Sequence, residues 1–188
     1  LAEPDSRMGW YIIVATVPAV LAGLLFKDIV EQAFTSPKMI GVFLLGTAVL
    51  LVVAETIGHR NRSMDQITWK DGLWVGFSQL LALLPGISRS GATIAGGMTR
   101  NLKRSAAARF SFLMSVPVML GAGVLAFKDL ADLPEGGEFM LPLLVGALVA
   151  MISGYIAIRW LIAYLSKHSL YVFALYCSVL GLIVIFTA

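Results

Sequence analysis

At the centre of the chain stands Leu84-Pro85-Gly86-Ile87-Ser88-Arg89-Ser90-Gly91-Ala92-Thr93, inside an apolar run, 73–99, that is long enough to cross a membrane. No simple helix passes through this stretch, because its proline removes a backbone donor and its glycines accept backbone angles that other residues avoid. Two helical arms remain, 72–84 and 92–99, of about 20 and about 12 Å at roughly 1.5 Å per residue, and neither crosses ~30 Å of hydrocarbon. The sequence therefore predicts a re-entrant helical hairpin over 72–99 with a polar tip.

The rest of the chain has the composition of a membrane protein. Of its 188 residues, 59% are hydrophobic and 13% are charged, whereas about 25% of the residues in a soluble domain are charged. Five further apolar stretches are long enough to span a bilayer as helices. These stretches are 10–26, 39–57, 106–127, 140–164 and 170–187. The predicted fold class is an all-α polytopic membrane protein with five transmembrane helices and one re-entrant hairpin, which excludes a water-soluble domain.

Charge and cysteine content argue against two other classes of protein. The net charge is +3, and the basic residues stand in short clusters between apolar runs instead of on one continuous face, so no nucleic-acid partner is expected. The single cysteine, Cys177, lies inside an apolar run and offers neither a disulfide framework nor a cysteine metal site.

The distribution of Lys and Arg separates the hairpin from the plain alternative, a sixth ordinary span, because cytoplasmic loops are enriched in positive charge. If the segment re-enters, ten Lys and Arg residues fall on one side and three on the other, whereas a sixth span gives five against eight. The ten are Arg7, Arg60, Arg62, Lys70, Arg100, Lys103, Arg104, Arg109, Arg159 and Lys167, and the three are Lys27, Lys38 and Lys128. The re-entrant topology gives the stronger bias of positive charge towards one side of the membrane. It places the N-terminus of this chain in the cytoplasm and the C-terminus outside.

Arg89 is the candidate functional residue at the predicted tip. An ionised side chain within a membrane segment costs about 2.5 to 3.5 kcal/mol on insertion scales, so an arginine there indicates a functional site. Its planar guanidinium offers paired donors that match phosphate oxygens, and Ser88, Ser90 and Thr93 add hydroxyl donors around it. These four residues predict a site for an oxyanion.

The backbone of the same stretch supports this interpretation. Gly86 and Gly91 let backbone N–H groups approach a ligand closely, and the following arm presents a helix N-terminus that favours negative charge. The apolar surroundings favour an amphiphile whose phosphorylated head reaches the tip while its chain stays in the bilayer. The structural alternative is that Arg89 contacts helix carbonyls while Ser90 and Thr93 cap the following arm.

Three other polar residues are weaker candidates. Gln79 either orients Ser88 or holds a water, or else makes a polar contact between helices, and the sequence does not separate these roles. Glu55 and His59 would share one helical face at a spacing of four residues and could then shuttle protons. Because Gly58 is expected to end that helix, anchoring at the membrane boundary is favoured instead.

Two segments resemble one known family. The segment 76–98 carries Gly-Phe-Ser-Gln-Leu-Leu-Ala-Leu-Leu-Pro-Gly-Ile-Ser-Arg-Ser-Gly-Ala-Thr-Ile-Ala-Gly-Gly-Met and resembles the second signature of the undecaprenyl-diphosphate phosphatase, or bacitracin-resistance, family. The segment 107–117, Ala-Ala-Arg-Phe-Ser-Phe-Leu-Met-Ser-Val-Pro, is similar to the same family. The resemblance implies a bacterial plasma-membrane hydrolase that removes the terminal phosphate of undecaprenyl diphosphate. Its product would be the monophosphate carrier of cell-wall synthesis.

The resemblance also implies roles for the residues at the tip. Arg89, Ser88 and Ser90 would be catalytic, with Arg89 binding the diphosphate. Substrate-binding roles would fall to four neighbours, which are Gly86, Gly91, Thr93 and Gln79. The implied partners are the polyprenyl diphosphate and membrane lipids, and a homo-oligomer is compatible with the pattern.

The chain departs from the family in one respect. The family has two inverted halves, each with a re-entrant hairpin, and the first hairpin, with paired glutamates, a serine pair and a histidine, has no counterpart here. Residues 1–57 would be the remainder of the first repeat, 58–70 a cytoplasmic loop and 71–188 the second repeat. The chain is therefore expected to hold half an active site and no metal ligand. A divalent cation, Mg²⁺ or Ca²⁺, would be held in the intact enzyme by carboxylates of the absent part.

A function of another class is a polyprenyl-phosphate transporter or flippase. Inverted repeats, broken helices and an anion site near the middle of the membrane are also features of secondary transporters. Release of inorganic phosphate in detergent, where no gradient exists, distinguishes a phosphatase from a transporter.

Overall fold

The computed structural model describes residues 4–26, 30, 33–131 and 140–188, and within them the fold is all-α. These residues form seven α-helices and two short 3-10 helices. They are α1 (Pro4–Leu25), α3 (Pro37–Ile57), η1 (Met64–Gln66), α4 (Trp69–Leu80), η2 (Leu81–Leu83), α5 (Arg89–Thr99), α6 (Arg104–Ala131), α7 (Met140–Leu165) and α8 (Tyr171–Thr187). The predicted all-α fold class is confirmed.

Four helices are long and apolar enough to cross a membrane, namely α1, α3, α6 and α7. Helix α8 is strongly apolar as well but has 17 residues. Each of these five helices lies on one of the five predicted spans. The protein is therefore a multi-pass membrane protein, while five spans as an exact number stays a prediction.

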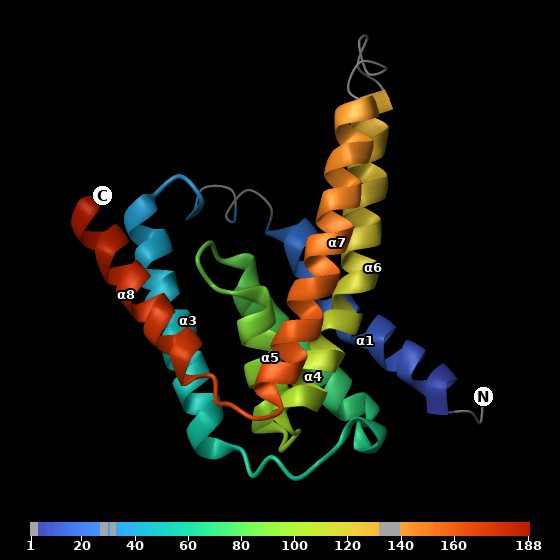
Figure 1. Cartoon of the computed structure of the whole chain (residues 1–188), viewed down its shortest axis with the longest axis vertical. Coiled ribbons are helices and arrows are strands. Elements are labelled where there is room, and N and C mark those ends of the chain that lie inside the picture. The colour runs from blue at the N-terminus through green and yellow to red at the C-terminus, as the bar shows by residue number, and fades with distance from the viewer. Residues whose placement is uncertain (1–3, 27–29, 31–32, 132–139) are drawn as a thin grey trace.

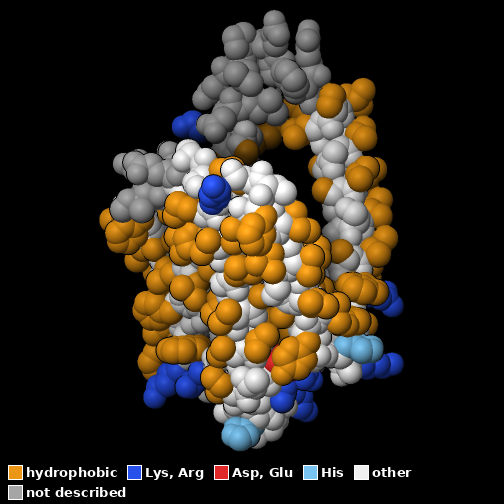
Figure 2. All heavy atoms as spheres, turned by 90° about the vertical axis from the view of Figure 1, so that its left-hand side faces the viewer, with side chains coloured by type: hydrophobic (Ala, Val, Ile, Leu, Met, Phe, Trp, Pro, Cys, Tyr) orange, Lys and Arg blue, Asp and Glu red, His pale blue; other side chains and the backbone are white. Residues whose placement is uncertain are grey.

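The outer surface of these helices is apolar. None of the residues of the most apolar 18-residue window of α7 is buried, and α6 exposes a similar row of aliphatic side chains. Figure 2 shows hydrophobic side chains over most of one face of the molecule, with Lys, Arg and His side chains gathered mainly towards one end. Such a surface is suited to contact with lipid chains.

Helical structure is interrupted between η2 and α5, where the sequence predicts the interruption. Leu84 is already extended, Gly86 has a φ of 96°, and helical geometry resumes at Arg89. Helices α4 and α5 pack side by side and antiparallel, and Trp74 Nε1 in the middle of α4 donates to Thr99 Oγ1 at the end of α5 over 3.1 Å. The two arms thus form a helical hairpin (Figure 1), and its path relative to the bilayer remains a prediction.

A buried carboxylate closes the base of this hairpin. Asp71, in the first turn of α4, accepts from Arg62 at 2.6 Å and from Arg100, the residue after α5, at 2.9 Å. We call Asp71, Arg62 and Arg100 the clasp. Burial alone would raise the pKa of the Asp71 carboxyl, but hydrogen bonds from Arg62, Thr68 and Arg100 hold it far below its usual range. The clasp therefore joins the two ends of the hairpin through an ionised group.

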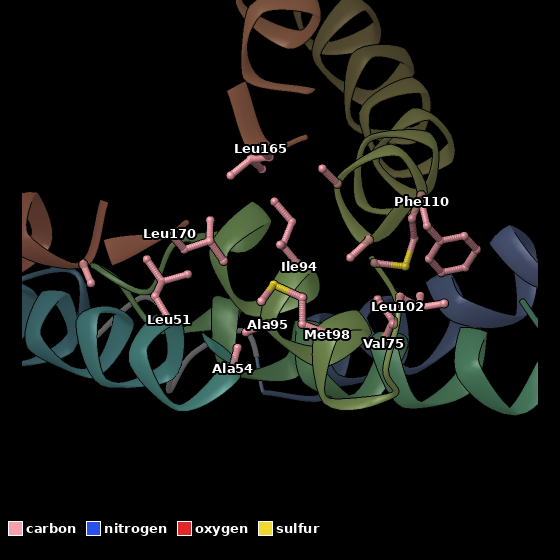
Figure 3. Packing of buried hydrophobic residues seen from close by; sticks show 14 of the residues in the cluster. Leu51, Ala54, Val75, Ile94, Ala95, Met98, Leu102, Phe110, Leu165 and Leu170 are labelled. Carbon is pink, nitrogen blue, oxygen red and sulfur yellow. The ribbon is translucent and has the colours of Figure 1, made fainter. Parts of the chain in front are cut away.

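The hydrophobic core surrounds α5, as Figure 3 shows. Ile94, Ala95 and Met98 of α5 belong to one cluster with residues of α3, α4 and α6. The approach to α6 is close, because a Cβ added at Gly97 would lie 2.9 Å from the Cβ of Ala107. All eight residues from Gly91 to Met98 are buried. This packing fixes α5 and with it the position of the tip residues at its N-terminus.

Candidate functional site

Thr47 of α3 holds the tip loop in place. Its hydroxyl donates to the carbonyl of Gly86 over 3.1 Å and accepts from the backbone N–H of Ser88 over 3.0 Å. At Gly86 only glycine fits, because φ is positive and a Cβ would collide with the carbonyl oxygen of Ile40. Thr47 was not singled out from the sequence. The available signal was its position as the one polar side chain between Lys38 and Glu55.

Ser88 is the N-cap of α5. Its Oγ accepts from the backbone N–H of Gly91 over 3.1 Å and lies 3.4 Å from Ser90 Oγ. The helix consequently begins three residues before the arm predicted at Ala92. Ser88 therefore takes the capping role that the structural alternative gave to Ser90 and Thr93. The N–H of Gly91 is used by this cap.

Arg89 is the first residue of α5 and is partly buried. Four arginines at the far end of the hairpin each pair with Glu55 or Asp71. In the described part of the chain, by contrast, the guanidinium of Arg89 forms no hydrogen bond and no ion pair, so the contact with helix carbonyls is not found there. An unpaired guanidinium beside two hydroxyls can bind an oxyanion.

A small cavity of about 70 Å³ lies beside the serines. Ser88, Ser90 and Gly91 form its polar side, and apolar residues of α7, α8 and the turn between them form the other, together with Ile94. Of the predicted site residues, the structure brings these three together on one wall. Arg89 lies between Ser88 and Ser90 in the chain but does not line the cavity.

Thr93 is buried inside the interface between α5 and α6. Its Oγ1 lies 2.6 Å from Ser111 Oγ and donates to the carbonyl of Arg89 over 2.8 Å. The hydroxyl predicted to bind substrate thus makes a contact between helices, and it fixes the backbone of Arg89. Ser111 was not singled out from the sequence, although it lies in the second segment that resembles the family.

Gln79 of α4 is 4% exposed, and its Oε1 has no hydrogen-bond partner. Among the buried side-chain oxygens and nitrogens of the described residues, this atom is the one that lacks a partner. A buried acceptor left unsatisfied costs about 1 to 3 kcal/mol. That cost favours a role for Gln79 in holding a water or a ligand group over a purely structural role.

Glu55 and His59 do not form a proton-shuttling pair. Helix α3 ends at Ile57 with Gly58 as its C-cap, as predicted. Glu55 accepts from Arg60 and Arg104 and from the backbone N–H of Leu170, whereas the backbone N–H of His59 donates to Asn101. Glu55 therefore joins α3 to the start of α6 and to the turn before α8.

The residues at the tip do not fit a divalent cation. Magnesium and calcium prefer carboxylate and carbonyl oxygens, whereas the tip offers two serine hydroxyls and a guanidinium. Among the residues with described positions, no three His, Cys, Asp or Glu side chains come together as metal ligands. The donor set at the tip suits a phosphate instead.

Fold and site together define a class, a multi-pass α-helical membrane protein with a broken hairpin whose tip can bind an oxyanion. Over residues 2–183 the sequence matches the family described as "Bacitracin resistance protein BacA", and the chain belongs to that family.

The chain is similar to several curated proteins. It is 42% identical to the undecaprenyl-diphosphatase of Corynebacterium glutamicum over 182 residues, which cover 96% of this chain and 62% of that protein. It is 41% identical to undecaprenyl-diphosphatase 1 of Corynebacterium jeikeium over 96% of this chain and 64% of that protein. With the undecaprenyl-diphosphatase of Mycolicibacterium smegmatis the identity is 40%, over 97% of this chain and 67% of the relative. The chain thus spans somewhat less than two thirds of the length of the corynebacterial relatives.

Proposed function

We propose that the intact protein hydrolyses undecaprenyl diphosphate to undecaprenyl phosphate and inorganic phosphate. The bond that breaks is the phosphoanhydride between the two phosphoryl groups, and water supplies the oxygen of the released phosphate. The names of the relatives support the reaction and the substrate. The product would return to cell-wall synthesis as the lipid carrier.

One observation carries the proposal, the unpaired guanidinium of Arg89 at the break of the hairpin. Four other arginines pair with two buried carboxylates, two with Glu55 and two with Asp71. Arg89 sits among apolar helices without such a partner in the described residues. A diphosphate head group would supply the negative charge that the protein does not supply there.

The proposed topology has five spans and one re-entrant hairpin, with the N-terminus of the chain in the cytoplasm. Helices α4 and α5 have 12 and 11 residues and reach about 18 and 16 Å, too short to cross the bilayer singly. The clasp supports entry and exit on one side, because it joins the two ends of the hairpin. Two inverted repeats, of which residues 71–188 form the second, would bring this tip to a site inside the membrane.

The tip residues would bind the diphosphate through different groups. Arg89 would donate paired hydrogen bonds and neutralise charge on both phosphoryl groups. The hydroxyl of Ser88 accepts from Gly91 and lies 3.4 Å from that of Ser90, and the hydroxyl of the two that does not donate to the other would donate to a phosphate oxygen. The N–H groups of Arg89 and Ser90 begin a helix and have no acceptor within it. Phosphoryl transfer rests mainly on such positioning and charge stabilisation.

Three further residues, Thr47, Thr93 and Gln79, would support the groups that contact the diphosphate. Thr47 fixes the loop before Ser88, and Thr93 fixes the carbonyl of Arg89. The unpartnered Oε1 of Gln79 would hold a water or orient a neighbouring hydroxyl. No carboxylate or imidazole among the described residues is bonded to Ser88, so we assign it phosphate binding and place the general base elsewhere in the intact protein.

The test is phosphate release by the full-length protein in detergent, with Arg89→Lys as the variant. Lysine keeps the charge but cannot reproduce the paired hydrogen bonds, so the rate should fall about 10- to 100-fold. Arg7→Lys is the matched control, because Arg7 is exposed and its one hydrogen bond, at 3.2 Å, goes to Tyr11. Its rate should stay near that of the parent.

Two results would overturn the proposal. If Arg89→Lys hydrolyses substrate as fast as Arg7→Lys, then Arg89 does not bind the diphosphate. If the parent protein releases no phosphate in detergent but moves the lipid across proteoliposomes, then the protein is a transporter.

A further inference from the structure

A second polar site lies between α6 and α7, away from the hairpin tip. It is a cavity of about 520 Å³. Ser105 and Arg109 line it from α6, Tyr155, Arg159 and Ile162 line it from α7, and Ser166 follows the end of α7. The cavity thus combines two arginines and two serine hydroxyls with apolar side chains.

The charge of this cavity is not compensated by the protein. Glu55 and Asp71 pair with four nearby arginines of the loops and helix ends. Within the described ranges, Arg109 and Arg159 have no carboxylate partner, and Arg159 donates only to the neutral hydroxyl of Tyr155, over 3.2 Å. Both arginines line the same cavity, so an anion there would meet positive charge without a carboxylate beside it.

The depth of the two arginines indicates where that anion comes from. Arg109 lies five residues into the span that begins at Arg104, and Arg159 lies six residues before the end of α7 at Leu165. At 1.5 Å per residue both lie about 7 to 9 Å from the helix ends. Phosphate groups of phospholipids lie at this boundary between head groups and acyl chains.

Apolar side chains continue from the cavity towards the middle of the membrane. On α6 these are the exposed Val116 and Leu120, and on α7 they are Ile152 and Leu148. A free phosphate would have no use for such a surface, whereas the acyl chains of a lipid would cover it. Basic pockets between transmembrane helices are a known kind of site for anionic head groups.

We propose that the α6–α7 cavity binds an anionic glycerophospholipid of the membrane. The lipid phosphate lies between Arg109 and Arg159, the hydroxyls of Ser105 and Ser166 bond its head group, and its chains follow α6 and α7. This site is separate from Arg89 and does not depend on the proposed phosphatase activity.

The test is lipid binding by the full-length protein in detergent, counted by native mass spectrometry. The probes are dioleoyl phosphatidylglycerol and, as the neutral counterpart, dioleoyl phosphatidylcholine. The variant is Arg109→Gln/Arg159→Gln, and the control is Lys70→Gln/Lys167→Gln, which removes the same charge from two exposed lysines. Two basic residues worth about 1 kcal/mol each predict a loss of about 30-fold in affinity for phosphatidylglycerol in the variant. The control should lose less than threefold.

Several outcomes decide the matter. Tighter binding of phosphatidylglycerol than of phosphatidylcholine, lost in the arginine variant alone, supports the site. An equal loss in both variants shows general surface attraction and overturns it, as does no loss in either. Displacement of phosphatidylglycerol by millimolar inorganic phosphate assigns the cavity to free phosphate and overturns the lipid.

A second variant guards against misfolding. Arg109→Lys/Arg159→Lys keeps the charge and the helices, and it should bind phosphatidylglycerol with an affinity between those of the parent and the glutamine variant. Binding by the lysine variant that is weaker than that of the glutamine variant would contradict the charge argument.

Discussion

At the residue scale, the tip depends on a side chain that is distant in sequence. Thr47 is fully buried in α3 and bonds the loop on both sides of Ile87, at Gly86 and at Ser88. Without that hydroxyl, a carbonyl and an N–H would both lose their partner in an apolar environment. The shape of the loop that presents Arg89 therefore depends on α3.

Replacing Thr47 by Val tests this dependence, because valine keeps the shape and removes the hydroxyl. Two unsatisfied backbone groups at about 1 to 3 kcal/mol each should lower the thermal midpoint in detergent and slow phosphate release several-fold. The matched control is Thr56→Val, whose hydroxyl is exposed and donates only to the carbonyl of Val53, over 2.9 Å. Equal thermal midpoints and rates for the two variants would show that Thr47 does not hold the loop.

The residues around the tip were predictable from the sequence where they are neighbours in the chain. Those that other helices contribute were not. Ser88, Ser90 and Gly91 meet on one wall because a helix start brings neighbours together. Thr47 lies 41 residues before Ser88, and Ser111 lies 18 residues after Thr93. Such contacts follow from helix packing, which no local pattern specifies. For the same reason, the sequence predicts that Thr93 binds the substrate, whereas in the structure its hydroxyl contacts Ser111 of α6.

At the scale of the element, α5 is short, rich in small residues and enclosed. Its 11 residues include buried Gly91, Gly96 and Gly97, and the last of these faces Ala107 of α6. Small residues at this interface let two helix backbones approach each other. The position of α5, and so of Arg89, depends on that approach.

Gly97→Ala should therefore destabilise the protein although alanine favours helices. The added methyl group would lie 2.9 Å from the Cβ of Ala107, and such overpacking costs about 1 to 3 kcal/mol. Gly146→Ala in α7 is the control, because nothing lies within 4 Å of a Cβ there. It should be neutral or stabilising by up to about 1 kcal/mol. Thermal unfolding in detergent measures both, and a stable Gly97→Ala variant would refute the close contact.

The elements themselves were largely predictable. Length and hydropathy placed helices on the five expected stretches, and proline with glycine placed the break. The first turn of α5 was missed, because Ser88 was assigned to the ligand alone and not also to the helix cap. The clasp at Asp71 was missed as well, since ion pairs between a loop and two helix ends leave no local pattern.

At the scale of the whole molecule, charge is distributed along one axis. Figure 2 shows most Lys and Arg side chains of that face at one end, and both buried carboxylates bind arginines of the loops and helix ends there. The positive-inside rule predicts that this end lies in the cytoplasm. The prediction requires that the hairpin leave the membrane on the side from which it enters.

Cysteine labelling in a Cys177→Ala background tests this orientation. Lys38 and Lys103 are both exposed, and re-entry puts them on opposite sides, whereas a sixth span puts them on the same side. A membrane-impermeant maleimide should label Lys38→Cys in intact cells and Lys103→Cys only after the cells are opened. Lys70→Cys, which precedes the hairpin, should behave like Lys103→Cys. Labelling of both Lys38→Cys and Lys103→Cys, but not of Lys70→Cys, in intact cells would refute the re-entrant topology.

The clasp has a consequence for tolerance of acid. An ordinary aspartate takes up a proton near pH 3.8, whereas the pKa of Asp71 is far lower because Arg62, Thr68 and Arg100 donate to it. A carboxyl with a lowered pKa in the folded state contributes stability above its unfolded value and loses it only as pH falls through the folded one. Asp71 thus stays ionised, and the two ends of the hairpin stay joined by the clasp, in neutral and in mildly acidic surroundings alike.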